Sequence, residues 1–189
     1  MADRFDGIHY DVEHDDWYAG DRWARFVDLI TYCQAQVDAY NQAYEPIVFG
    51  VDIPPHFLAG PGSSGQIKSS WDVMTIVDAV TLMDYRDFAD VRWDDIRDDG
   101  IIPRAQPFVA DGNALGKPVV IGVELTENPY NHVTFFEESA AYMEAELREV
   151  SRYFAGDWAY KGLALHDYAG WRAKALVYRV RLPIVIKGL

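Results

Sequence analysis

Residues Pro118 to Glu124 read PVVIGVE, an apolar run that ends on one carboxylate. A strand that is buried on both faces of a parallel sheet has this pattern. Four other stretches on either side of it also have strand character, and they are Phe5–Glu13 (FDGIHYDVE), Ile47–Ile53, Ala79–Asp84 and Gly162–His166. The sequence therefore predicts five strands.

Helical patterns separate these strands. They cover Trp23 to about Tyr40, Trp71–Val77, Pro103–Leu115 and a later helix that Thr134 is expected to cap. Gly116 is expected to end the third of them. Repeated strand–helix units imply parallel strands joined by helical crossovers, so the fold class is α/β.

Two architectures fit five such units: an open doubly wound sheet and part of a closed (β/α)₈ barrel. No GxGxxG motif follows the first strand, which weakens the dinucleotide-binding form of the open sheet. Polar residues gather at the strand ends, where a barrel places its active site. They are Glu13, Asp52, Asp84 with Tyr85, Glu124, and His166 with Asp167. We expect a partial barrel over residues 1–172, followed by a tail or appended strand over 173–189.

Composition limits the partners. The 189 residues carry a formal net charge of −13, which opposes binding to nucleic acid. No apolar run is long enough to span a bilayer, and no signal peptide opens the chain, so we expect a cytoplasmic protein, or a secreted one if a signal lies upstream. Aromatic residues make up 14%, which suits both a sugar-binding cleft and an ordinary core. Cys33 is the single cysteine, so an intramolecular disulfide is excluded.

The first strand carries the strongest chemical signal. Residues two apart in a strand point to one side, so His9, Asp11 and Glu13 form a row. The negative charge of Asp11 is expected to raise the pKa of Glu13. A carboxylic acid that stays protonated near neutral pH is the group that cleavage of a glycosidic bond requires. A solvated edge strand is the alternative.

This stretch resembles the Asp-Gly-x-Asp-x-Asp-x-Glu signature on the fourth barrel strand of glycoside hydrolase family 18, the chitinases and endo-N-acetylglucosaminidases. Asp6, Gly7, Asp11 and Glu13 match it, and His9 departs from it, since the family has an acid there. The resemblance implies that Glu13 protonates the leaving oxygen. It also implies that Asp11 supports Glu13 and orients the acetamido group of the substrate.

A second match follows on the third predicted strand. Met83–Asp87 (MDYRD) is similar to the Met-x-Tyr-Asp stretch that closes the sixth strand of the family, with Arg86 inserted. The resemblance gives Tyr85 the role of steadying the substrate-derived intermediate. Trp171 is the nearest candidate for the tryptophan that the family places after strand eight. Bacterial proteins of the same glycosidase-like group share these patterns and the Gly-Val-Glu strand end.

Other assignments stay open at the strand ends. Glu124 stands where many retaining glycosidases place a nucleophile, which would need carboxyl groups roughly 5–5.5 Å apart. It could instead form an ion pair with Arg86 or a similar cation. His9, Asp11 and His166 could converge on a metal ion, but a hydrogen-bonding histidine is the simpler reading, and we expect no cofactor and no metal.

On this numbering the chain holds strands four to eight, whereas a full barrel takes about 250 residues. Three explanations are open: a piece of a longer product, a chain that pairs with itself or another chain, and a degenerate relic. The sequence predicts a hydrolase that cleaves a polysaccharide, glycan or cell-wall oligosaccharide. Its catalytic residues are Glu13, Asp11, Tyr85 and Glu124, and its substrate-binding residues are His9, Asp52, Asp84, Arg86, His166 and Trp171. The alternative is a non-catalytic carbohydrate-binding or scaffold protein.

Overall fold

The computed structural model describes residues 5–13, 21–57, 59–60, 69–91 and 99–178. Strands and helices alternate along them. The strands are β1 (Gly7–Tyr10), β2 (Val48–Ile53), β3 (Ala79–Met83), β4 (Val119–Glu124) and β5 (Tyr160–His166). The helices are α1 (Arg22–Ala43), α2 (Ser70–Ile76), α3 (Ile101–Leu115), α4 (Ala140–Tyr153) and α5 (Tyr168–Tyr178), with short 3₁₀ turns η1 (Asn131–Val133) and η2 (Phe154–Gly156).

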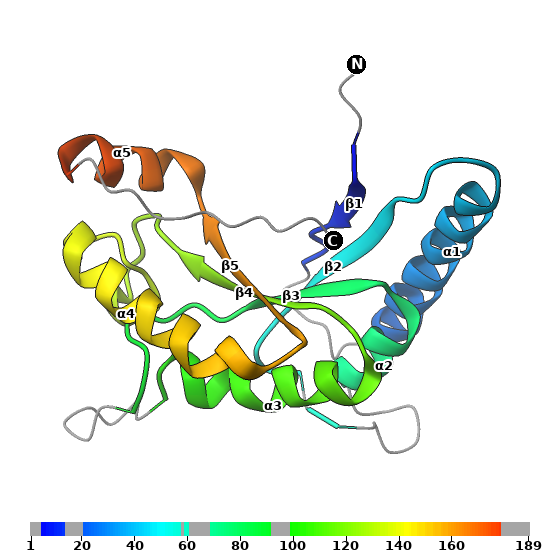
Figure 1. Cartoon of the computed structure of the whole chain (residues 1–189), viewed down its shortest axis with the longest axis horizontal. Coiled ribbons are helices and arrows are strands. Elements are labelled where there is room, and N and C mark those ends of the chain that lie inside the picture. The colour runs from blue at the N-terminus through cyan, green and yellow to red at the C-terminus, as the bar shows by residue number, and fades with distance from the viewer. Residues whose placement is uncertain (1–4, 14–20, 58, 61–68, 92–98, 179–189) are drawn as a thin grey trace.

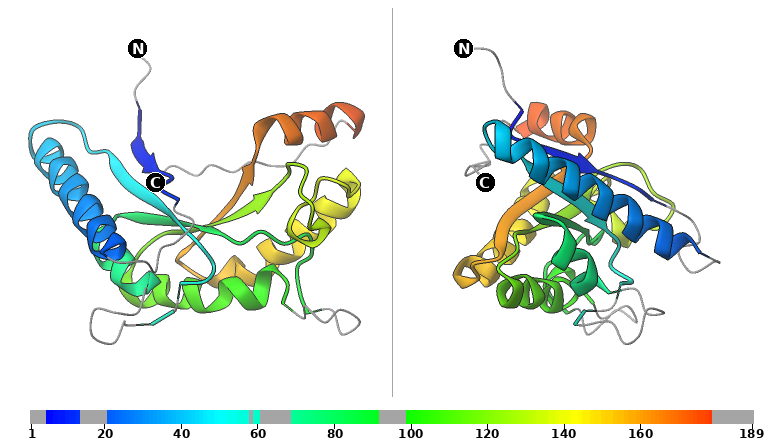
Figure 2. Two further views of the ribbon diagram at one scale, coloured as in Figure 1. Left: turned by 180° about the vertical axis from the view of Figure 1, so that it is seen from behind. Right: turned by 90° about the vertical axis from the view of Figure 1, so that its right-hand side faces the viewer.

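The five strands form one parallel sheet in the order β1-β2-β3-β4-β5. Strand order that follows chain order is consistent with part of a (β/α)₈ barrel, whereas a doubly wound sheet reverses its order at a switch point. Figure 1 shows α1 to α4 following one another around the outer side of the curved sheet, with α5 beyond the end of β5. Figure 2 shows the same arrangement from behind. Within the described residues, β1 and β5 are separate edges and the barrel does not close.

Alternate residues of each strand point to opposite faces of the sheet. Val51, Leu82 and Ile121 face the helices and are fully buried in the main core. Their neighbours Asp52, Thr81 and Gly122 line a cavity on the other face. Two-residue alternation of this kind is the ordinary pleat of a strand, and here it separates an apolar layer from a polar one.

Helix α3 packs closely against the sheet at Gly112. A Cβ built on Gly112 of α3 would lie 2.7 Å from Val119 Cγ2, 2.8 Å from the Lys117 carbonyl oxygen and 2.9 Å from Ala159 Cβ. Glycine at this point therefore lets the helix approach β4. Gly116 ends α3 in the left-handed region, at φ 64°, and this confirms the expected stop.

Two local predictions were wrong. Thr134 does not cap α4, because the side chain of Ser139 accepts the hydrogen bond from Tyr142 N at its start. The Thr134 hydroxyl instead donates to the Thr126 carbonyl, 2.7 Å away, and so holds the loop after β4. Residues 173–178 belong to α5 rather than to an irregular tail or a strand, while 179–189 lie outside the described residues. The division at residue 173 into two domains stays a prediction.

Gly112→Ala tests the close packing of α3. Alanine gains helix propensity over glycine by about 1 kcal/mol, but the backbone oxygen of Lys117 cannot move away cheaply. We expect a net loss of roughly 1–3 kcal/mol in the free energy of unfolding, measured by urea denaturation. Gly156→Ala is the control, since a Cβ there meets nothing within 4 Å. Equal stability of the two variants would contradict the packing argument.

Candidate active site

The cavity on the inner face of the sheet has a volume of about 350 Å³. All five strands contribute to it or end beside it. Its lining residues are His9, Asp11, Asp52, Thr81, Met83, Tyr85, Gly122, Ala164, Leu165 and His166. Five of the residues that the sequence assigns to the site line this cavity, and these are His9, Asp11, Asp52, Tyr85 and His166.

Two residues of the polar row that begins in β1, His9 and Asp11, lie on the cavity side of the sheet. Tyr10 and Val12 pack against the main core, while His9 and Asp11 line the cavity. Regular strand geometry ends at Tyr10, before Asp11 and Glu13. His9 Nε2 lies 2.8 Å from Asp52 Oδ1, so the two form a hydrogen-bonded pair across β1 and β2. Gly50 makes room for this pair, because a Cβ there would lie 2.6 Å from His9 Nδ1.

Glu13 lies beside the same polar residues, with an exposed side chain. Partial burial raises its pKa first, the charges of Asp11 and Asp52 raise it further, and a hydrogen bond with Asp11 adds to the effect. His166 works in the opposite direction, because its positive charge lowers the pKa of Glu13. The influence of Asp11 on Glu13 has the direction that the sequence predicted.

Glu124 and His166 form a second carboxylate–histidine pair. They are direct partners in the β4–β5 register, and Glu124 Oε2 lies 2.8 Å from His166 Nδ1. Glu124 Oε1 accepts hydrogen bonds from Leu125 N at 2.7 Å and Thr126 N at 2.6 Å. The hydrogen bond to Glu124 is the largest of the causes that raise the pKa of His166. The alternative in which Glu124 forms an ion pair thus has His166, and not Arg86, as the partner among the described residues.

Tyr85 follows β3 and points into the cavity. Its ring is parallel to that of His166, with centroids 6.3 Å apart and planes inclined by 13°. Burial raises the pKa of the Tyr85 phenol first, and the nearby carboxylates, Glu124 foremost among them, raise it further. The hydroxyl consequently stays protonated and can donate a hydrogen bond.

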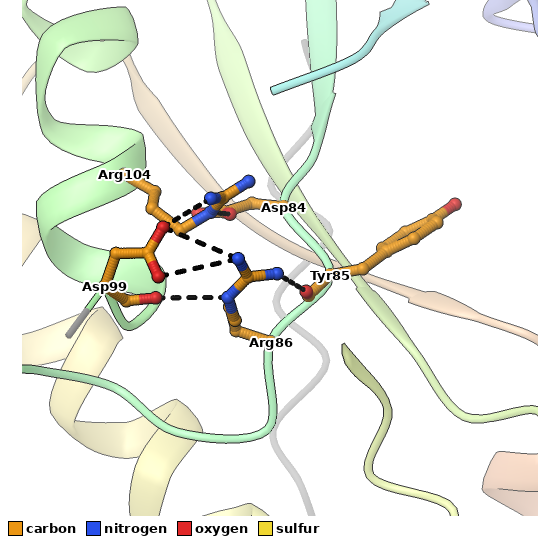
Figure 3. Close-up of polar contacts among 5 residues, drawn as sticks. All are labelled: Asp84, Tyr85, Arg86, Asp99 and Arg104. Atoms are coloured by element: carbon orange, nitrogen blue, oxygen red, sulfur yellow. Dashed lines mark hydrogen bonds and ion pairs between the residues drawn. The ribbon is translucent and has the colours of Figure 1, made fainter. Parts of the chain in front are cut away.

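Asp84 and Arg86 lie on the other side of the chain from Tyr85, as Figure 3 shows. Asp84 is fully buried and accepts a hydrogen bond from Arg104 Nε at 2.7 Å. Arg104 also pairs with Asp99 at 2.6 Å, and Arg86 donates to the Asp99 carbonyl at 3.1 Å. These groups tie the end of β3 to α3. Asp84 and Arg86 do not line the cavity. Their positions therefore do not favour contact with a substrate bound there.

Trp171 also lies away from the cavity lining. It packs against the main core and its ring centroid is 5.7 Å from that of Tyr168. Sequence reasoning missed Thr81, Met83, Gly122, Ala164 and Leu165. Counting back in steps of two from Tyr85 and Glu124 would have found the first three, since they share a face with those residues.

His9, Asp11 and His166 line one cavity, but no group of three or more potential ligands in the described part of the chain is arranged to hold a metal ion. None of the described helices is both long and apolar enough to cross a bilayer.

Comparisons with known proteins give limited matches. No protein-family model matches the chain, and no curated protein matches it. A similar solved structure is a GH18 chitinase from Cycas revoluta in complex with (GlcNAc)3, with a TM-score of 0.41 and 18% identity over 64% of this chain and 37% of that one. A double mutant of the same chitinase with (GlcNAc)4 aligns at a TM-score of 0.41 and 17% identity. The chain thus matches little more than a third of the enzyme's length.

Asp84→Asn tests the buried ion pair. Burial raises the pKa of Asp84 from its ordinary 3.8 to about 7, against the opposing effect of Arg104. The folded protein then holds a proton that the unfolded chain releases, so the contribution of Asp84 to stability is present below about pH 4 and is lost as the pH rises to about 7. Relative to Asp84→Asn, wild-type stability should fall by roughly 2–4 kcal/mol across this range.

The measurement is urea denaturation at several pH values. Asp99→Asn is the control, because it removes a more exposed carboxylate that pairs with the same Arg104. This variant should retain most of the wild-type fall in stability, because the charge of Asp99 is the smallest of the causes that act on the pKa of Asp84. A difference between wild type and Asp84→Asn that does not depend on pH would refute the buried titration.

Proposed function

We propose that the protein is a glycosidase-like hydrolase of polysaccharides, glycans or cell-wall oligosaccharides, with Glu13 as its general acid. The observation that carries the proposal is the polar row His9–Asp11–Glu13 beside a cavity that also contains Tyr85. Partial burial first, and then the charges of Asp11 and Asp52, raise the pKa of Glu13, which favours the protonated form that a general acid needs. The 350 Å³ cavity falls within the size range of small-molecule sites.

In this proposal Glu13 gives its proton to the leaving oxygen as the glycosidic bond breaks. Asp11 holds Glu13 and orients the acetamido group of the substrate, whose oxygen attacks the anomeric carbon. The protonated Tyr85 hydroxyl donates a hydrogen bond to the intermediate that forms when the acetamido oxygen bonds to the anomeric carbon. The polar residues of the cavity wall, His9 and Asp52, contact the sugar hydroxyls. These roles for Asp11 and Tyr85 follow the family 18 resemblance.

The alternative nucleophile, Glu124, is less well placed. Its carboxylate is 8% exposed and already accepts two backbone hydrogen bonds as well as the contact with His166. A nucleophile needs a lone pair directed at the substrate, and three partners restrict Glu124. The arrangement therefore favours assistance by the substrate over attack by Glu124.

A carbohydrate-binding protein without catalysis is the second candidate. The exposure of the Glu13 side chain favours it, because contact with water limits how far partial burial can raise the pKa of this acid. Such a protein would keep the cavity and its aromatic and polar wall while turning over no substrate.

Glu13→Gln tests the general acid. Glutamine keeps the size of the side chain but has no proton to donate, so hydrolysis of aryl glycosides should fall about 10²-fold or more. Turnover is followed by release of the aryl group over a panel with and without a 2-acetamido group. Glu127→Gln, at an exposed position away from the cavity, is the matched control and should keep wild-type activity. Folded wild-type protein that binds the sugars and hydrolyses none of them would favour the binding protein.

Tyr85→Phe tests the hydroxyl that the cavity holds. The phenyl ring keeps its place beside His166, so only the hydrogen bond is lost. We expect kcat for 2-acetamido substrates to fall by about 10- to 100-fold with little change in KM, since the bond is made mainly to the intermediate. Substrates that lack the acetamido group should be poor for both proteins. Equal rates with both substrate classes would instead favour Glu124 as nucleophile.

A further inference from the structure

The carboxylate of the Glu124–His166 pair is buried and held by the backbone, unlike that of a surface ion pair. Two consecutive backbone N–H groups, of Leu125 and Thr126, hold one oxygen of the buried Glu124 carboxylate. The other oxygen lies 2.8 Å from His166 Nδ1. Because Glu124 and His166 are opposite each other in the sheet register, the backbone fixes both ends of the pair. The imidazole ring is thus held from one side, and Nε2 is the nitrogen that remains for other contacts.

The held ring faces the proposed catalytic groups. His166 and Asp11 line the same cavity, and the His166 ring is parallel to that of Tyr85. The charged groups around His166 come from several elements. They are Glu124 from β4, Asp167 next to it in the chain, and Asp11 and Glu13 after β1. All four are acidic, so the imidazole is surrounded by groups that favour its protonated form.

We propose that Glu124 and His166 form a positioning pair, in which Glu124 fixes the imidazole ring and His166 supplies the positive charge that stabilises Glu13 as a carboxylate. The inference rests on the proposed function of Glu13. When Glu13 gives its proton to the leaving oxygen, the C–O bond breaks and a new carboxylate appears next to Asp11. The imidazolium balances that charge. Water then bonds to the anomeric carbon while the bond from that carbon to the acetamido oxygen breaks, and the water gives a proton back to Glu13.

His166 transfers no proton in this scheme and is a positioning residue. Its effect is electrostatic: the charge eases ionisation of Glu13, whereas Asp11 opposes it. The pKa of Glu13 is consequently set by two opposing influences, since Asp11 favours the protonated acid and His166 favours the carboxylate.

The first test needs no turnover. Ring-labelled histidine and carboxyl-labelled glutamate are followed by NMR through a pH titration, with signals assigned from His166→Gln and Glu13→Gln. In Glu124→Gln we expect the His166 midpoint to fall by about one pH unit, because the negative partner is gone. In His166→Gln we expect the Glu13 midpoint to rise by about half a pH unit, since His166 is partly solvated.

The variants suit the measurement. Glu124→Gln keeps an oxygen for the two backbone N–H groups, and the His166 side chain is 61% exposed, so both proteins should fold. His132→Gln is the matched control, because it removes a histidine that does not line the cavity and should move neither midpoint. An unchanged His166 midpoint in Glu124→Gln, or an unchanged Glu13 midpoint in His166→Gln, would overturn the proposal.

The second test uses the pH dependence of kcat/KM. Activity requires protonated Glu13, so loss of the imidazolium should move the alkaline limb to higher pH and lower the maximum by about three- to tenfold. Glu124→Gln and His166→Gln should act alike, and the double variant should lose little more than either one. A far larger loss in Glu124→Gln than in His166→Gln would overturn the pairing and point to a nucleophilic Glu124. If wild type turns over no substrate, the proposed function fails and the NMR midpoints alone decide the charge pairing.

Discussion

The structure depends on the register of its parallel strands. Neighbouring strands are paired residue by residue, and alternate side chains of each strand point to opposite faces of the sheet. The register places His9 opposite Gly50 and Glu124 opposite His166. The alternation along each strand then determines which side chains lie on each face of the sheet. One face buries Val51, Leu82 and Ile121 under the helices, and the other collects the polar residues that line the cavity. The polar contacts across neighbouring strands depend on this register.

The end of β3 shows how sharply the two faces differ. Asp84 and Tyr85 are consecutive in the chain. The Asp84 carboxylate is nevertheless buried beside Arg104 of α3, whereas the Tyr85 phenol lines the cavity. Burying a charge without a partner is costly, and the guanidinium of Arg104 offsets part of that cost. Asp99 and Arg86 extend the contacts to the loop before α3. The ion pairs thus keep β3 and α3 together while Tyr85 remains available to a ligand.

Much of this arrangement follows from sequence pattern. The five strands, the stop of α3 at Gly116 and the row of His9 and Asp11 were predictable, because period-two alternation and glycine at a helix end are local effects. Long-range partners were not. Nothing in the spacing indicates that Glu124 pairs with His166 rather than Arg86, since the choice depends on the register of β4 with β5. Alternation along β3 predicts that Asp84 points toward the helices only once Tyr85 is known to point toward the cavity.

Gly50 gives the cavity a property of its own. No side chain of residue 50 fills the space beside β1, and His9 extends across it to reach Asp52. A larger residue there would displace the imidazole without replacing any group that lines the cavity. The shape of the cavity wall at His9 therefore depends on residue 50, which does not itself line the cavity.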